Sequence, residues 1–158
     1  MASKKDVVAH LGDIRDQIVA VAEAIPDASW DAIVYENGWT ERQLLYHIAS
    51  TSGVASFVLA MSRLPAGAGA SGGEPFDNDA FNRDQVAMRE GRSLGDALDE
   101  VRASIQRSIQ DIEAASDDEL QAHFTAPWGA EGTVADVIIS SLNGHLGTHA
   151  VELRTASA

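Results

Sequence analysis

The chain of 158 residues contains no cysteine, which excludes disulfide bonds, thiolate zinc ligands and a cysteine nucleophile within the protein. It is also poor in basic residues, since 11 Lys and Arg stand against 24 Asp and Glu and give a formal net charge of −13. No cluster of basic residues is longer than Lys4-Lys5. Because phosphate backbones and anionic lipids are bound through clustered positive charge, we expect no nucleic acid and no membrane among the partners.

Long hydrophobic runs are missing as well, because the uninterrupted apolar runs fall far short of the roughly 20 residues that a bilayer requires. The first residues lead into an amphipathic segment that contains Asp13, Arg15 and Asp16, unlike a signal peptide. With 45% hydrophobic and 22% charged residues, the composition is that of a soluble protein. The length suits one domain over residues 1–158. We therefore expect a single cytoplasmic domain.

Apolar residues recur at intervals of three and four in several segments, which is the spacing of helices with one buried face. The residues Thr40-Glu41-Arg42-Gln43 match a capping box and mark one helix start clearly. Helices are predicted over residues 4–25, from Thr40 to about Leu64, from Asp77 or Asn78 to near Gly91, from Ser93 through Ile112, and from Thr133 through His149.

The segments between these helices are predicted to be loops and short pieces. Residues 65–75 are rich in glycine and read as a loop within the domain. A short turn is expected at 116–119, and residues 33–35 and 122–126 suit short extended pieces. The fold class that follows is all-α, a four-helix bundle with an extra short helix and long connecting loops.

Three of the five histidines fall where a metal ion could be bound. His145 and His149 form an H-x-x-x-H pair in the last helix, and residues four apart on a helix are neighbours. His47 lies on the inward arc of the second helix and supplies a third imidazole, so a site for a divalent metal is predicted. Zinc or nickel suits imidazole better than magnesium does. The alternative is that each histidine forms hydrogen bonds within the core, and His10 and His123 are expected at the surface or in supporting positions.

The surroundings of the pair restrict its chemistry. Leu146 follows the first histidine of the pair, where the zinc-protease motif requires a glutamate, so proteolysis is disfavoured. Glu152 lies on the same helical face and could orient a ligand or act as a base, while an ion pair with Arg154 or with another helix is an equal alternative. Gly144 and Gly147 favour close helix packing over room for a ligand.

Several short motifs occur in the order and spacing of a known family, which the chain resembles over nearly its whole length. The family is the DinB-like superfamily, and within it the chain is most similar to the group with the N-terminal domain of mycothiol-dependent maleylpyruvate isomerase. The motifs are Gly38-Trp39-Thr40 before Leu44-Leu45-Tyr46-His47, Phe81-Asn82-x-x-x-Val86 before Gly91-Arg92-Ser93, and Gly144-His145-Leu146-Gly147-Thr148-His149.

The resemblance implies a four-helix bundle that holds a divalent metal, often zinc or nickel, and an activity of the thiol-dependent transferase or isomerase type. By position, His47, His145 and His149 would be the metal-binding triad. In the isomerase group a glutamate matches His145 and a C-terminal domain follows, whereas this chain has the all-histidine set and ends at Ala158. The resemblance therefore implies the metal site more directly than isomerase activity.

The leading functional hypothesis is a metal-dependent enzyme of the thiol S-transferase or isomerase type. An ion held by three neutral imidazoles would lower the pKa of a low-molecular-weight thiol such as mycothiol, which would attack a small-molecule electrophile. A metal-dependent hydrolase is the alternative for the same site. Two hypotheses from other classes are a non-catalytic metal- or ligand-binding bundle, assembled as a homodimer through an apolar helical face, and a scaffold with vestigial histidines.

Overall fold

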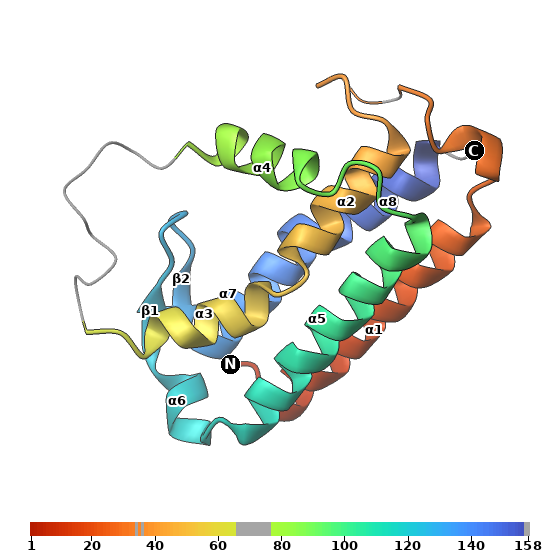
Figure 1. The fold of residues 1–158 in the computed structure, drawn as a ribbon. Coiled ribbons are helices and arrows are strands. Elements are labelled where there is room, and N and C mark those ends of the chain that lie inside the picture. Colours follow the sequence, from red (N-terminus) through yellow and green to blue (C-terminus); the bar gives the residue numbers. More distant parts are fainter. Residues whose placement is uncertain (34, 36, 66–76, 157–158) are drawn as a thin grey trace.

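Four long helical rods enclose one core in the computed structural model of the chain (Figure 1). The structure describes residues 1–33, 35, 37–65 and 77–156, without the side chains of residues 154–156. The rods are α1 (Lys4–Ala24), α2 (Glu41–Thr51) with α3 (Val54–Ser62), α5 (Leu94–Ala114), and α7 (Val134–Ser141) with the π-helical segment η2 (Leu142–Gly147) and α8 (Thr148–Ala156).

The rods form a closed ring of neighbours. Helix α1 contacts α5 and α8, and α2 contacts the same two helices from the opposite side. Their inward residues are fully buried, among them Leu11, Leu45, Ile105 and Ile138. The predicted all-α four-helix bundle is therefore confirmed, with a continuous apolar core between its helices.

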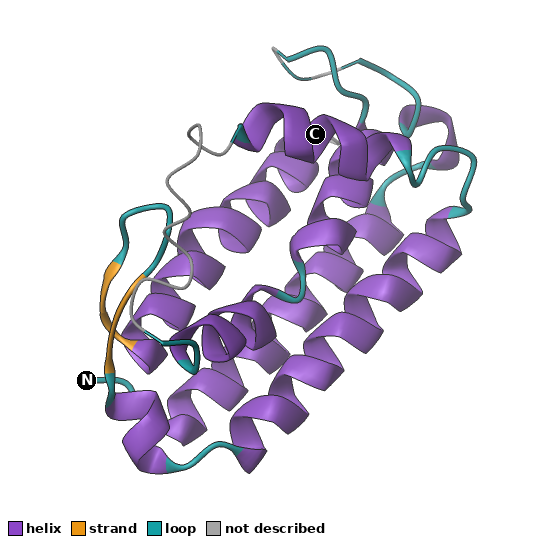
Figure 2. Cartoon of the chain, turned by 60° about the vertical axis from the view of Figure 1, so that its left-hand side comes forward, coloured by secondary structure: helices purple, strands orange, loops and turns teal. Residues whose placement is uncertain are grey.

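Shorter elements connect the rods (Figure 2). They are η1 (Asp27–Ser29), α4 (Asn78–Ala87), α6 (Asp117–Gln121), β1 (His123–Thr125) and β2 (Glu131–Thr133). Helix α4 contacts α2 and is the extra short helix expected from the sequence. The strands pair in an antiparallel hairpin in which Phe124 lies opposite Gly132. The hairpin includes the predicted extended piece at 122–126, while the glycine-rich loop predicted at 65–75 lies outside the described residues after Pro65.

Two of the helix starts that position the later site are fixed by side-chain caps. The Thr40 hydroxyl accepts a hydrogen bond from the backbone N–H of Gln43, and the side-chain oxygen of Gln43 accepts one from the backbone N–H of Thr40, so the predicted capping box is confirmed. Thr133 accepts a hydrogen bond from the backbone N–H of Asp136 at the start of α7. These caps set where each helix begins and hence which residues face inward.

The second predicted helix is interrupted, contrary to the expectation of one helix from Thr40 to Leu64. It breaks at Ser52-Gly53 into α2 and α3. The hydroxyls of Thr51 and Ser52 donate to the carbonyls of His47 and Ile48, respectively, and such bonds compete with the helical pattern. Glycine adds backbone freedom at the same point, so the break has a local cause.

The final helix is not a single α-helix either, because the wider π-helical turn η2 separates α7 from α8. Four residues exceed the roughly 3.6 of an α-helical turn, so a four-residue repeat would rotate away from the core by about 40° at each step. The wider turn compensates for this rotation, and such turns are frequent at functional sites. The buried residues of this rod that recur every four positions are Ile138, Leu142, Leu146 and Ala150.

The segment Glu41–Ser62 has the length and apolar composition of a membrane-crossing helix, with a mean hydropathy of 1.5 in its most apolar window. The expectation from the sequence concerned only uninterrupted apolar runs, and this segment contains none of that length. In the fold, 56% of that window is buried in the bundle. The core therefore accounts for much of the apolar character of this segment.

Candidate metal centre

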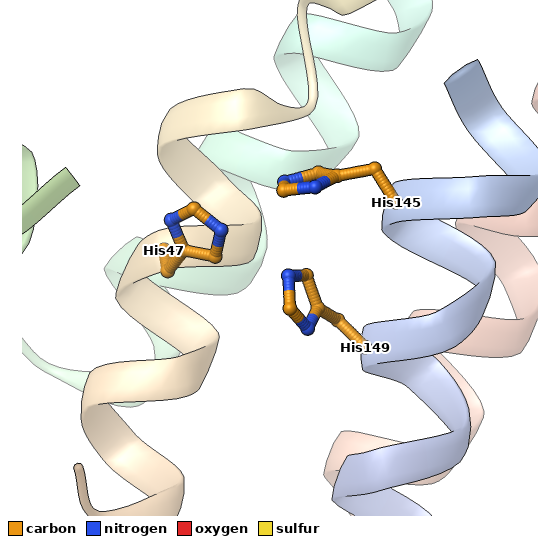
Figure 3. A group of neighbouring side chains, drawn as sticks. All are labelled: His47, His145 and His149. Atoms are coloured by element: carbon orange, nitrogen blue, oxygen red, sulfur yellow. The ribbon is translucent and has the colours of Figure 1, made fainter. Parts of the chain in front are cut away.

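Three histidines from two rods converge inside the bundle. His47 projects from α2, His145 from η2 and His149 from α8, and their rings point toward one another (Figure 3). The ring centroids lie 4.9 Å apart for His47 and His145, 4.9 Å for His47 and His149, and 4.6 Å for His145 and His149. One ligand nitrogen from each ring lies within 4.8 Å of the other two.

Burial determines the protonation of two of these rings. His47 is only 2% exposed, and burial, assisted by the nearby His145 and His149, lowers the pKa of His47 to about 3. Burial likewise lowers the pKa of His145 to about 4, with a contribution from His149 and a smaller opposing effect of Glu152. Both imidazoles are therefore neutral at neutral pH, which is the form that binds metal ions.

Two nitrogens of the cluster lack partners among the described residues. His47 Nδ1 and His145 Nε2 are buried, and neither atom accepts or donates a hydrogen bond within these residues. Buried polar atoms are normally satisfied, so these two nitrogens favour a metal-binding role over hydrogen bonding within the core. A divalent ion bound tetrahedrally by imidazole at about 2.1 Å has ligand nitrogens about 3.4 Å apart, which ring movements of roughly 1 Å would reach. The residues present therefore fit a three-histidine metal site.

The third imidazole is held by a carboxylate on its own helix. His149 Nδ1 lies 2.5 Å from Glu152 Oε2. Since an ionised carboxylate only accepts, Nδ1 carries the proton and Nε2 remains as the metal-binding atom. Of the roles considered for Glu152, the contact supports the orienting one. The side chain of Arg154, the partner considered in the alternative, lies outside the described residues.

The remaining histidines lie elsewhere, as expected. His10 Nε2 is 2.7 Å from Asn143 Oδ1, so it ties α1 to η2. His123 faces Glu131 across the hairpin with 68% of its side chain exposed. Of the two glycines beside the triad, Gly147 lies against α1, where an added Cβ would meet Ile14 at 3.6 Å, and this agrees with a packing role. At Gly144 an added Cβ would meet nothing within 4 Å, so the packing expectation is wrong there.

Three residues near the triad were not identified from the sequence. The ring of Trp39 lies 5.2 Å from that of His47 at an angle of 50°. Glu41, in the first turn of α2, is only 1% exposed. Tyr35 is half-buried, and burial together with the charges of Glu41 and Glu152 raises the pKa of its phenol. The motif Gly38-Trp39-Thr40 was a signal for Trp39, whereas nothing in the sequence places Tyr35 beside Glu152.

Comparisons with known proteins agree with this architecture. No curated protein matches the chain significantly. Among solved structures, the chain is similar to YfiT from Bacillus subtilis, described as a probable metal-dependent hydrolase with an unusual four-helix bundle topology. The two share 18% sequence identity and a TM-score of 0.66 over 96% of this chain and 86% of YfiT, which shows a common fold. The sequence model of the DinB superfamily matches residues 10–153, so the chain belongs to the DinB superfamily.

Proposed function

We propose that the protein is a metal-dependent hydrolase whose divalent ion is bound by His47, His145 and His149. The observation that carries the proposal is the convergence of three imidazoles in which two buried nitrogens lack partners among the described residues. The description of YfiT as a probable metal-dependent hydrolase supports the same class of activity. Zinc and nickel are the metals that the donor set favours, because three neutral nitrogens suit borderline ions.

A divalent ion at this site would supply Lewis-acid activation of a water molecule at neutral pH. The hydrolysis would add the water oxygen to a carbonyl carbon and break the bond to the leaving group, which takes up a proton. The chain's own residues prepare the site. Burial keeps His47 and His145 neutral, and Glu152 holds the ring of His149.

Thiol transfer is the second candidate, and the resemblance of the motifs around His47 and His149 to the mycothiol-dependent group favours it. The chain has no cysteine, so a low-molecular-weight thiol such as mycothiol would have to be supplied from outside. The same site would then lower the pKa of that thiol, and the thiolate sulfur would form a thioether with a small-molecule electrophile such as an epoxide, whose C–O bond opens and whose oxygen takes up the proton. With a net charge of −13, such small molecules suit the protein better than nucleic acid does.

One assay distinguishes the two activities. Metal-loaded protein is incubated with ester, amide and epoxide substrates, with and without a panel of thiols that includes mycothiol and bacillithiol. We expect thiol-independent hydrolysis that is lost in His149→Ala. Thioether formation that requires both the thiol and the metal would move the assignment to the transferase. No turnover of either kind would leave a metal-binding protein without catalytic activity.

A further inference from the structure

The segment that precedes α2 folds back close to this helix, which carries His47. Ile33 and Thr40 form an isolated antiparallel bridge, and Gly38 donates its backbone N–H to the carbonyl of Tyr35 at 2.9 Å. Gly38 adopts a φ of +83°, which favours glycine at this turn. The turn packs the aromatic rings of Tyr35 and Trp39 against the core. Both rings therefore have fixed positions close to α2.

The hydroxyl of Tyr35 is buried and has no hydrogen-bond partner in the part of the chain that the structure describes. Buried tyrosine hydroxyls normally find one, as Tyr46 does by donating to the carbonyl of Arg92 at 2.5 Å. Folding gains nothing from leaving a donor unsatisfied, so the contrast between these two tyrosines calls for a functional explanation.

The position of Tyr35 connects it with the histidine cluster. Its phenol interacts electrostatically with Glu152, the carboxylate that binds His149, and with Glu41 at the start of α2. Trp39, four residues further along, lies against the ring of His47. The unsatisfied hydroxyl of Tyr35 is therefore close enough to Glu152, the partner of His149, to interact with its charge. Burial and both carboxylates keep the phenol protonated at neutral pH, so it acts only as a donor or neutral acceptor.

We propose that Tyr35 is a substrate-binding residue, whose hydroxyl donates a hydrogen bond to a carbonyl-type oxygen of an uncharged ligand held beside His47, His145 and His149. This inference rests on the proposed function. The negative charges of Glu41 and Glu152 act on the same hydroxyl, so they oppose a further negative charge on the ligand atom that this hydroxyl contacts, whereas the positive charge of a bound ion acts at the triad. A neutral ester or amide satisfies the donor without bringing a third negative charge to the two carboxylates.

The test compares zinc-loaded wild type, Tyr35→Phe and the matched control Tyr46→Phe, with acetamide as the probe because it is uncharged at neutral pH and presents a carbonyl. We expect all three proteins to bind zinc equally. Tyr35→Phe should bind the probe about fivefold more weakly than the other two, which is the usual net contribution of one neutral hydrogen bond.

Thermal unfolding of the metal-free proteins gives a second and independent readout. Removal of an unsatisfied buried hydroxyl should leave the Tm of Tyr35→Phe unchanged or raised, whereas Tyr46→Phe should lose stability with its bond to Arg92. Equal acetamide affinity in wild type and Tyr35→Phe, or a fall in Tm as large as that of Tyr46→Phe, overturns the proposal. A wild type that takes up no zinc instead overturns the proposed function itself.

Discussion

Glu152 accepts a hydrogen bond from His149 at 2.5 Å, three residues apart on α8, and thereby selects the nitrogen that the ring presents to its neighbours. Carboxylates that orient a metal-binding histidine contribute to affinity although they do not touch the ion. The contact thus links a half-exposed side chain on α8 to the chemistry of the buried cluster.

Replacement of Glu152 by glutamine should weaken metal binding by about 10- to 100-fold, because the neutral amide fixes the ring of His149 less firmly. Helix content should not change. A competition titration against a chromophoric chelator measures the affinity. Glu131→Gln, which alters the exposed pair with His123 on the hairpin, is the control and should bind metal like the wild type. Equal affinities in the two variants would argue against the orienting role.

The metal-free protein should lose stability as the pH falls from about 6.5 toward 3. In this window the unfolded chain binds protons at positions 47 and 145, while the folded state, with pKa values of about 3 and 4, does not. Fewer protons in the folded state mean that acid favours unfolding. Urea denaturation in the presence of a chelator at several pH values measures the effect. His47→Gln should reduce the slope, and an unchanged slope would refute the assigned cause.

Chelation should lower the Tm and leave most of the helical circular dichroism intact. Metal binding stabilises the folded state through mass action, whereas the bundle has its own apolar core, with residues such as Leu45 and Ile138 fully buried. Thermal scans with and without the chelator provide the comparison. Loss of most of the helical signal on chelation would mean that the ion is required for folding.

Glu100 joins α5 to the turn after α4, because it accepts hydrogen bonds from Arg89 and Arg92 at 2.6 Å each. Burial opposes its ionisation, yet these two arginines hold the pKa of Glu100 below its usual value. Glu100→Gln should lower the free energy of unfolding by about 1–2 kcal/mol, measured with urea. Asp99→Asn, at a site that is 77% exposed and paired with Arg102, is the control and should change it by less than about 0.5 kcal/mol.

Local patterns in the sequence were enough to predict the bundle and the convergence of the three histidines. The capping residue Thr40 fixes the start of α2, and with it the inward direction of His47. His145 and His149 are four residues apart, so they share one side of their rod even with the π-helical turn between α7 and α8. These features depend on residues close together in the chain, which is why sequence reasoning found them.

The features that sequence reasoning missed depend on packing or on competition between hydrogen bonds. The break at Ser52-Gly53 involves hydroxyls that can bond either to solvent or to backbone carbonyls. The π-helical turn was hidden because a fixed helical repeat was assumed throughout the last rod. The approach of Tyr35 to Glu152 joins residues 117 positions apart, and only the folded chain brings them together.

Elemental analysis of protein purified without a histidine tag tests the central claim most directly, because the account requires an ion bound by His47, His145 and His149. The prediction is about one zinc or nickel ion per chain in the wild type. Almost none should remain in the double variant His47→Ala, His145→Ala. A wild type without metal, or a metal content that survives unchanged in the double variant, would contradict the account.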